Sequence, residues 1–291
     1  MAKVTSISSL GWAHYTLYEA LPRMAARGFT RVEIASFSSY CFHFNFGSPT
    51  PLELKKMLDD LGLAPVALNY SIGVTRAWVP QDAERFVSET SRKIEQLPQV
   101  GIPMVTMNFS NRNDRDDQEM QLTNMVKAYD RVAEIAKTHG VRMLLEVPHL
   151  YDVAYGPEQV YWIFDHINSD NIGALADCSH WGIIGYDVDE FFSRLGERLW
   201  HVHLRDSRGP DTGDRMQDLE LTPGAGTVDF GRFGRAMDAA GYKGDVSLEF
   251  EYRDMTLDDI EREYDVGIKH LVACGWEFPS SVLEKMPDAA T

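Results

Sequence analysis

Cysteine is scarce in this sequence, and long apolar runs are missing from it. The 291 residues include three cysteines, Cys41, Cys178 and Cys274, which are too few and too scattered for a disulfide framework or a zinc ribbon. A reducing, cytoplasmic location is therefore expected. No apolar run approaches the roughly 20 residues that cross a bilayer, and the first ten residues, MAKVTSISSL, lack the apolar region of a secretory signal. Neither a membrane nor a secretory route is expected.

Positive charge is also in short supply. The chain has 44 acidic residues against 28 basic ones, which gives a formal net charge of −16 at pH 7. A surface of this sign repels the phosphate backbone, whose contacts dominate affinity for nucleic acids. Nucleic acid is therefore not an expected partner, and a small neutral sugar suits the charge better than a highly anionic ligand.

Apolar segments that are typical of strands alternate eight times with segments of helical periodicity, in a unit that recurs about every 35 to 40 residues. Five joins from helix to strand are a glycine followed by an apolar or aromatic residue. The expected strands cover residues 4–10, 31–35, 63–70, 103–109, 141–147, 172–178, 199–204 and 245–251. The expected helices cover residues 16–27, 51–61, 81–99, a long segment ending at 139, 157–167, 188–195, 230–240 and 257–274.

Parallel strands joined by helical crossovers close well when there are eight of them. The sequence therefore predicts one α/β domain over residues 1–291, a single (β/α)₈ TIM barrel with a C-terminal extension after about residue 277. An open doubly wound sheet is the alternative, but no GxGxxG turn follows the first expected strand.

Four expected strands end on a side chain that can bind a metal. The segments LLEVPH, ADCSH, HVHLRD and SLEFE place Glu146, Asp177, His203 and Glu249 at the carboxyl ends of the fifth to eighth strands, where (β/α)₈ barrels carry their active sites. Any one of these residues alone would more often be a helix cap, a surface charge or a packed core residue. As a set they indicate one divalent metal, Mn²⁺ first, with Mg²⁺, Co²⁺ or Zn²⁺ as alternatives.

Such a centre suits the chemistry of a carbon acid. A proton next to a carbonyl is too weakly acidic for a free carboxylate at neutral pH, but a metal on the carbonyl and the adjacent hydroxyl stabilises the enediolate. One glutamate can then take the proton and a second can return it. Return to the opposite face gives an epimer, return to the next carbon an isomer, and loss of a β-oxygen an elimination.

The same segments, together with GAGTVDFGRF at residues 224–233, resemble the xylose-isomerase-like superfamily of sugar (phosphate) isomerases and epimerases. Its ketose 3-epimerases, the tagatose and psicose epimerases, are the nearest template. The resemblance implies that the four strand-end residues ligate the metal, and that Glu146 and Glu249 form an acid/base pair on opposite faces of the substrate. It also implies that His180 holds a substrate oxygen.

Further substrate contacts are less defined. The arginine that the epimerases place a few residues after the ligand histidine has no aligned match, since Arg208 lies one position early and Arg205 stands where many relatives have lysine. His149 could contact substrate or cap its loop, and Trp12 and His14 could stack on a sugar or plug the barrel mouth. The substrate-binding candidates are His180, His149, Arg205, Arg208, Trp12, His14 and Asn108.

Two other features stay open. Glu251 shares the strand parity of Glu249 and is an alternative ligand, although an exposed loop residue is the more common case. The aromatic segment from Tyr40 to Phe46 fits either a lid over the substrate or a subunit interface, because exposed aromatic side chains need cover. A homo-oligomer, dimer or tetramer, is expected, and a hetero-oligomer is an alternative.

The expected function is a divalent-metal-dependent isomerase or epimerase of a ketose or keto-sugar. A lyase or dehydratase of a 3-oxo-sugar or 3-oxo-glycoside is the main alternative, because the resemblance extends to inosose dehydratase and to enzymes that cleave 3-oxo-glycosides, such as C-glycoside deglycosidases. A repair endonuclease of the same superfamily needs more histidine ligands, whereas this chain has Asn69, Tyr70 and Asn108 at the ends of the third and fourth strands. A non-catalytic sugar-binding barrel is the non-enzymatic alternative.

Overall fold

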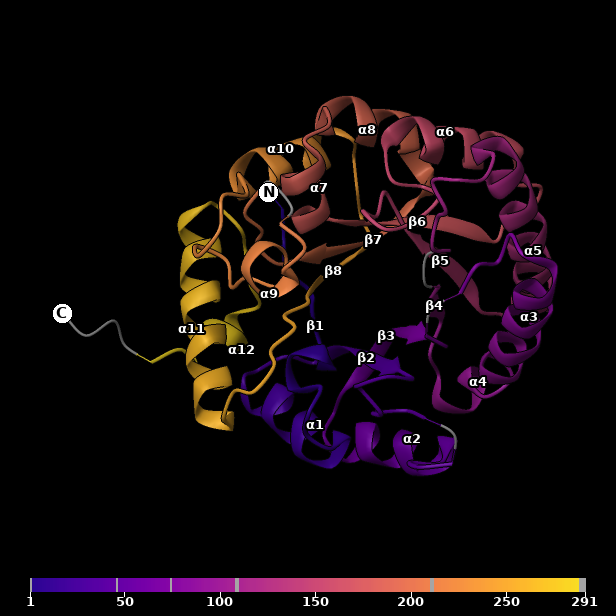
Figure 1. Cartoon of the computed structure of the whole chain (residues 1–291). Helices are drawn as coiled ribbons and strands as arrows, with labels where there is room; N and C mark the ends of the chain where they lie inside the picture. The colour runs from indigo at the N-terminus through magenta and orange to yellow at the C-terminus, as the bar shows by residue number, and fades with distance from the viewer. Residues whose placement is uncertain (1, 46, 74, 108–109, 210–211, 288–291) are drawn as a thin grey trace.

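Eight parallel strands close into a barrel and follow one another around it in chain order (Figure 1). The structure is a computed structural model that describes residues 2–45, 47–73, 75–107, 110–209 and 212–287. The strands are β1 (Ser6–Ser8), β2 (Arg31–Phe37), β3 (Ala64–Ser71), β4 (Met104–Met107), β5 (Arg142–Glu146), β6 (Ile172–Asp177), β7 (Leu199–Leu204) and β8 (Asp245–Leu248). The (β/α)₈ TIM barrel expected from the sequence is confirmed.

Helices surround the strands (Figure 1). The longer ones are α1 (Leu17–Ala26), α2 (Pro51–Asp60), α3 (Pro80–Ile94), α5 (Gln118–Thr138), α6 (Pro157–His166), α8 (Val188–Leu195), α10 (Phe230–Ala239) and α11 (Leu257–Ala273). Shorter ones are η1 (Ser9–Trp12), α4 (Leu97–Val100), α7 (Cys178–Ile184), η2 (Gly196–Arg198), α9 (Arg215–Asp218) and α12 (Ser280–Leu283). Several begin at a capping box, as in α2, where Thr50 and Glu53 satisfy each other's backbone N–H groups.

One large apolar cluster joins the strands to the outer helices. It includes a buried side chain from each of the helices α1, α3, α5, α10 and α11, namely Leu21, Phe86, Tyr129, Phe233 and Ile268. A smaller cluster, which draws on β3 to β6, contains Val66, Ala67, Met104, Leu144 and Leu175. Because close-packed interiors move little, these clusters hold the strand ends in fixed relative positions.

Three departures from the expected element boundaries are the most informative. The helix expected over 81–99 is divided into α3 and α4, because Pro98 lacks the N–H that a continuous helix needs. The sixth strand ends at Asp177, and α7 starts at once, with the Asp177 carboxylate accepting a hydrogen bond from Ser179 N at 2.7 Å. The eighth strand ends at Leu248, so Glu249 lies one residue beyond it.

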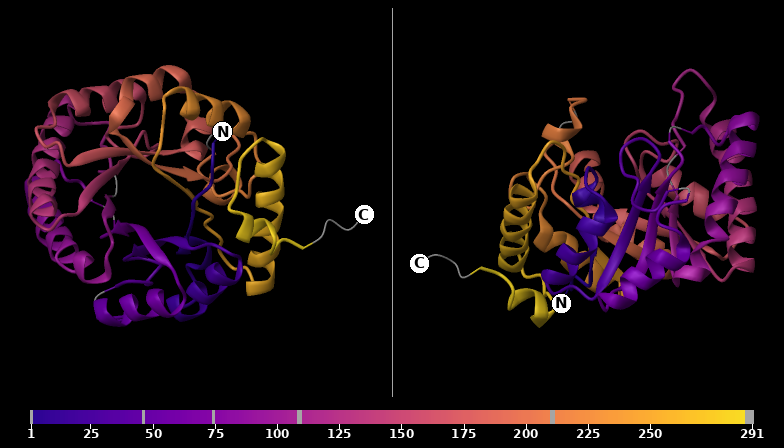
Figure 2. Two further views of the ribbon diagram at one scale, coloured as in Figure 1. Left: turned by 180° about the vertical axis from the view of Figure 1, so that it is seen from behind. Right: turned by 90° about the horizontal axis from the view of Figure 1, so that it is seen from below.

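The two ends of the chain lie at one end of the barrel, and long loops project from the other (Figure 2). Residues before β1 pair with the segment after α11, where Val4 N donates to Glu277 O at 2.9 Å. The carboxyl ends of the strands therefore open on the side away from the termini. None of the described helices combines the length and the apolar character that a bilayer crossing requires.

Candidate metal centre

Glu146, Asp177, His203 and Glu249 lie together at the carboxyl ends of β5 to β8. Each offers an atom within 4.8 Å of the atoms offered by the other three. Strand register accounts for this meeting, because Asp177 pairs with His203 across β6 and β7, and Glu249 N donates to Leu204 O at 3.2 Å. Asp177, His203 and Glu249 are buried and Glu146 is half-buried, so the group lies on the inner side of the strand ends.

The atoms presented by this cluster fit a divalent cation. His203 Nδ1 lies 3.1 Å from Glu249 Oε2 and Asp177 Oδ2 lies 2.8 Å from Arg205 Nη2, but among the described residues neither atom makes a contact with hydrogen-bond geometry. Buried polar atoms without partners are costly and are rare in folded proteins. Three carboxylates and one imidazole are ligands that Mn²⁺, Mg²⁺, Co²⁺ and Zn²⁺ accept. A divalent metal bound here would satisfy both atoms.

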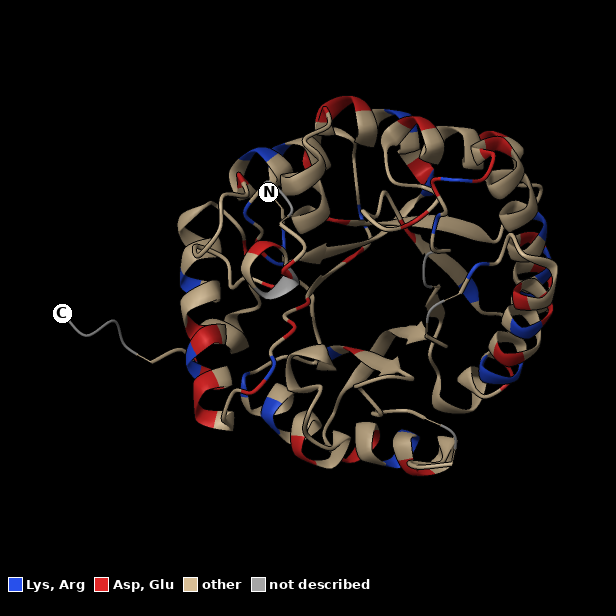
Figure 3. Cartoon of the chain, in the orientation of Figure 1, with Lys and Arg blue, Asp and Glu red and all other residues tan. Residues whose placement is uncertain are grey.

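Burial and two basic neighbours shift the pKa values of the three carboxyl groups in the cluster. Burial raises the pKa of Glu249 above its usual range. Burial also acts to raise the pKa of Glu146 and of Asp177, but positive neighbours outweigh it, so both pKa values lie below their usual range. For Glu146 the neighbour is His180. For Asp177 the neighbours are Arg205 first and then His180. Acidic positions lie both on the outer helices and around the barrel opening (Figure 3).

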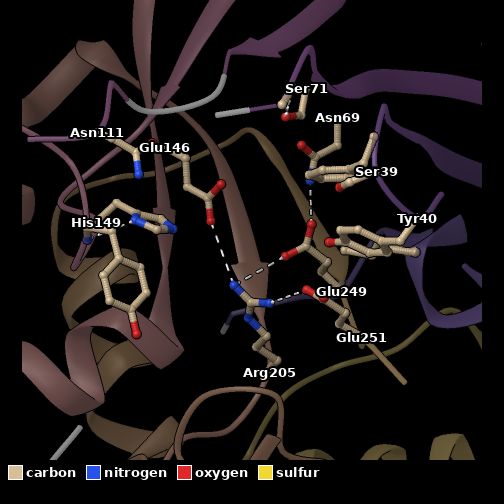
Figure 4. A pocket seen from close by; sticks show the side chains of 14 residues that line it. Ser39, Tyr40, Asn69, Ser71, Asn111, Glu146, His149, Arg205, Glu249 and Glu251 are labelled. Carbon is tan, nitrogen blue, oxygen red and sulfur yellow. Dashed lines mark hydrogen bonds and ion pairs between the residues drawn. The ribbon is translucent and has the colours of Figure 1, made fainter. Parts of the chain in front are cut away.

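One guanidinium nitrogen, Nη2 of Arg205, faces three of the four side chains. It lies 2.8 Å from Asp177 Oδ2. It also lies 3.8 Å from Glu249 Oε2 and 3.9 Å from Glu146 Oε1 (Figure 4). Arg205 is 3% exposed. The carboxylates of the cluster are thus already arranged around a positive charge, as they would be around a metal.

Two further carboxylates, Glu220 and Glu251, hold the other edge of this guanidinium. Arg205 Nη1 lies 2.5 Å from Glu220 Oε2 and 3.5 Å from Glu251 Oε2, and Arg205 Nε donates to Ser179 Oγ at 3.0 Å. Glu251, expected to be exposed, is 2% exposed, because it turns inward toward Arg205 and Arg253 (2.9 Å). Sequence reasoning missed Glu220, which lies in the long loop after β7.

Glu33 is another buried carboxylate that sequence reasoning did not assign to the site. It lies on β2, and its Oε2 is 3.0 Å from His203 Nε2. Burial acts to raise the pKa of Glu33, but the charges and hydrogen bonds of His203 and His201 outweigh it and hold that pKa below its usual value. An acidic residue inside the apolar segment RVEIA was the one local signal for it.

A cavity of about 320 Å³ opens onto the cluster (Figure 4). Its size is at the lower end of small-molecule sites, which measure roughly 300–1,000 Å³. Neutral polar and aromatic groups supply most of the wall around the charged residues. The lining residues are Leu10, Phe37, Ser39, Tyr40, Asn69, Ser71, Gly73, Asn111, Glu146, His149, Tyr151, Arg205, Glu249 and Glu251.

A family model for the xylose isomerase-like TIM barrel matches residues 21–274. The chain belongs to that family. The resemblance noted from the strand-end motifs is thereby confirmed, and it brings with it relatives that act as isomerases, epimerases and dehydratases.

Three curated relatives illustrate this range. An inosose isomerase of Bacillus subtilis (strain 168) is 25% identical over 175 residues, which are 59% of this chain and 61% of that protein. A ketose 3-epimerase of Arthrobacter globiformis is 29% identical over 143 residues, 48% of this chain and 46% of that protein. A 3-dehydroshikimate dehydratase of Pseudomonas aeruginosa is 25% identical over 244 residues, 80% of this chain and 36% of that protein. The chain spans less than two thirds of the length of each.

Solved structures share the fold. The IOLI protein with a bound zinc atom superimposes with a TM-score of 0.73 at 18% identity, and the match covers 98% of this chain and 99% of that one. This likeness concerns the fold alone.

Two of the expected substrate-binding residues flank Glu146 in this xylose isomerase-like barrel. His180 is buried, with Nε2 3.4 Å from Glu146 Oε1 and 3.4 Å from Arg205 Nη2. Its ring lies 4.1 Å from that of His149, which lines the cavity and accepts a hydrogen bond from Tyr151 N at 3.3 Å. Both histidines therefore stand beside the cavity wall that carries Glu146.

The other expected substrate-binding residues are placed differently. Arg208 is exposed and donates to Ala225 O, whereas Arg205 lines the cavity. Trp12 is fully buried and stacks on Tyr264 with ring centroids 4.7 Å apart. His14 is exposed and lines a different cavity, beside the first strands. Asn108 lies outside the described residues.

The aromatic segment of the loop after β2 contributes Tyr40 to the cavity wall. Arg253 lies over the Tyr40 ring at 5.3 Å. Phe42 on the same loop is 54% exposed, while Phe44 is buried; Phe46 lies outside the described residues. The segment thus covers part of the cavity with one side chain and presents another to solvent.

Asp152 ties together two loops that reach the cavity. Its carboxylate accepts hydrogen bonds from Ser110 N at 3.0 Å and from Ala154 N at 3.1 Å, next to Asn111 and His149. Burial raises the pKa of Asp152 to about 7, so in the folded chain this carboxyl keeps its proton to a much higher pH than it does in the unfolded chain.

We expect Asp152 to make the folded state less stable as pH rises. A group whose pKa is raised on folding contributes stability below its unfolded pKa, and that contribution is lost as pH rises through the folded value, here about 7. Asp152→Asn removes the titration. Urea unfolding at pH 5 and pH 8 should show the wild type losing up to about 2–3 kcal/mol relative to this variant. Asp165→Asn, at an exposed position, is the control; an equal pH response in wild type and Asp152→Asn would contradict the prediction.

Proposed function

We propose that this protein is a divalent-metal-dependent isomerase or epimerase of a ketose or a cyclic keto-sugar. The observation that carries the proposal is that Glu146 and Glu249, which line one cavity, lie together with Asp177 and His203. Relatives that are inosose isomerases and ketose 3-epimerases support the assignment.

The metal would be held by Glu146, Asp177, His203 and Glu249. When bound, it would polarise the substrate carbonyl and stabilise negative charge on its oxygen. The carboxylate-rich set favours Mn²⁺, with Mg²⁺ and Co²⁺ as alternatives. Zn²⁺ is a further alternative that the zinc-bound IOLI protein supports.

Two carboxylates from different strands face the cavity and can exchange a proton with a substrate there. Glu249 is the better proton carrier, because burial raises its pKa. Asn69 Nδ2 donates to its Oε1 at 2.5 Å and holds the side chain in place. Glu146 lies beside His180, which keeps it ionised and able to accept a proton. Removal by one carboxylate and return by the other would invert or move a stereocentre.

The charge of the cavity supports a neutral substrate. Its one guanidinium, Arg205, is engaged by five carboxylates, and the other polar groups on the described wall are serine, asparagine, tyrosine and histidine side chains. A further anionic group would meet net negative charge even beside a divalent cation. Free ketoses and keto-inositols fit this wall better than phosphorylated or carboxylated sugars.

A lyase or dehydratase is the second candidate function. It is supported by relatives that are dehydratases, including an inosose dehydratase that is 22% identical over 84% of this chain. The same first proton removal would be followed by loss of a β-oxygen instead of reprotonation. Glu146 and Glu249 would then act on a carbon and on a leaving group.

Deuterium exchange separates these functions. The metal-loaded protein is incubated in heavy water with free ketoses, keto-inositols and 3-oxo-glucosides, and the products are followed by NMR and mass spectrometry. We expect deuterium at the carbon next to the carbonyl together with an epimer or isomer. Release of water or of an aglycone would assign the lyase function instead. Metal binding without deuterium incorporation from any substrate would favour a non-catalytic sugar-binding barrel.

A homo-oligomer, dimer or tetramer, is also proposed. Large apolar side chains are exposed near the first loops, with Tyr18 at 53%, Phe42 at 54% and Leu52 at 72%, and a second copy of the chain would cover them. Sedimentation equilibrium tests this; a monomer, or assembly with a different chain only, would contradict it.

A further inference from the structure

Glu33 reaches from β2 across the interior of the barrel to β7. The two strands are not neighbours, since β8 and β1 lie between them. Glu33 Oε2 lies 2.6 Å from His201 Nε2 and 3.0 Å from His203 Nε2. Glu33, His201 and His203 are all 0% exposed, so one carboxylate oxygen is shared by two buried imidazole rings.

A buried carboxylate at this position is an unusual choice of side chain. Bulky branched apolar residues dominate the interior of barrels of this fold, and burying a charge costs several kcal/mol unless partners offset it. Two serines extend the polar group, with Ser247 Oγ 3.3 Å from Glu33 Oε2 and 2.7 Å from Ser6 Oγ. Packing alone does not account for these buried polar side chains, whereas the contact between Glu33 and the proposed metal ligand His203 does.

The contact decides which nitrogen of His203 can bind a metal. A carboxylate oxygen that faces two ring nitrogens accepts from both, so His203 Nε2 carries a hydrogen and donates it to Glu33. The other ring nitrogen, Nδ1, is then the one left to give a lone pair to a metal. Nδ1 is the nitrogen that lies 3.1 Å from Glu249 Oε2 and has no hydrogen-bond partner among the described residues.

We propose that Glu33 is a positioning residue of the metal centre, which fixes the ring and the tautomer of His203 so that Nδ1 is the ligand atom. The inference rests on the proposed metal site but not on the proposed reaction. A carboxylate behind a ligand histidine also makes the ring a stronger ligand, and loss of such a partner commonly weakens metal binding about 10- to 100-fold. His201 and Ser247 hold the carboxylate in place.

Metal affinity, measured by chelator competition with Mn²⁺ and Co²⁺, tests the proposal without any substrate. Glu33→Leu removes the acceptor at similar volume and should weaken binding about 10- to 100-fold. Glu33→Gln keeps an acceptor oxygen but removes the charge, and should weaken binding less. Thr106→Val is the matched control, because Thr106 is also buried inside the barrel and its hydroxyl has no hydrogen-bond partner among the described residues.

A second measurement uses the unaltered protein, so it holds even if a Glu33 variant fails to fold. In the Zn²⁺-loaded chain, ¹⁵N NMR of the histidines should show Nε2 of His203 protonated and Nδ1 bound to the metal. Metal bound to Nε2 would overturn the proposal, as would a folded Glu33→Leu variant that binds as tightly as Thr106→Val. A metal bound by Glu33, His201 and His203 would also overturn it, because Glu33 would then be a ligand itself. Absence of catalysis with normal metal binding would count against the proposed function alone.

Discussion

Glu249→Gln should reduce deuterium exchange into the substrate by about 10²- to 10⁴-fold, the usual contribution of a general acid or base. Glutamine keeps the shape of the side chain and an oxygen that can accept from Asn69 Nδ2, but it cannot carry a proton. Glu249 is buried, with a pKa raised by that burial, so proton transfer is the property that the change removes. Glu146→Gln should cause a loss of similar size, because each direction of the reaction needs both carboxylates.

The measurement must separate proton transfer from metal binding, since both residues are also proposed ligands. Metal content is therefore determined for each variant, and exchange is measured at saturating metal. Glu158→Gln, which alters an exposed glutamate in the first turn of α6, is the matched control and should retain wild-type rates. The double variant should lose little more than either single one, because the two residues act as a unit. A rise in KM with an unchanged kcat would show that Glu249 only binds.

The fold could be predicted from the sequence because each of its βα units has a local signature. Apolar strands and amphipathic helices repeat eight times, with a glycine at five of the joins from helix to strand, and closure follows from the number of strands. The boundaries that were missed depend on contacts that a pattern does not show. Asp177 ends its strand by capping the next helix. The apolar pattern of the sequence does not show this and predicts a strand that continues into Cys178.

Some residues of the candidate site could likewise be predicted from the sequence, and others could not. Glu146, Asp177, His203 and Glu249 could be found because each lies at or next to the end of a strand, and parallel strands bring their ends to one rim. Glu33 and Glu220 could not, because neither ends a strand: Glu33 lies inside β2 and meets His203 170 residues later, and Glu220 lies in a long loop whose path brings it back to Arg205. Arg205 was expected among the substrate contacts, yet the structure places it among the proposed ligands themselves, because it directly follows β7, two residues after His203.

Arg205→Met should lower the free energy of unfolding of the metal-free protein by about 3–5 kcal/mol, the cost of breaking a buried ion pair by removing one partner. Methionine fills much of the same volume, so charge is the main difference. Without the guanidinium, Asp177, Glu220 and Glu249 are left 5% exposed or less with no cation between them, and like charges in a buried site repel one another strongly. Arg205→Lys keeps the charge but cannot reach both edges of the cluster at once, so an intermediate loss is expected.

A divalent metal should rescue this variant more than it stabilises the wild type. Three of the carboxylates that lose their contact with Arg205 in this variant are also proposed metal ligands, namely Asp177, Glu146 and Glu249. With the competing guanidinium gone, the site should bind a cation more tightly, and tighter binding to the folded state raises Tm. Thermal and urea unfolding with and without Mn²⁺ measure both effects. Arg208→Met, three residues along and exposed, should change stability by no more than about 0.5 kcal/mol. An Arg205→Met protein as stable as Arg208→Met, or one that Mn²⁺ does not stabilise, would show that the guanidinium does not balance the charge of a metal-binding cluster.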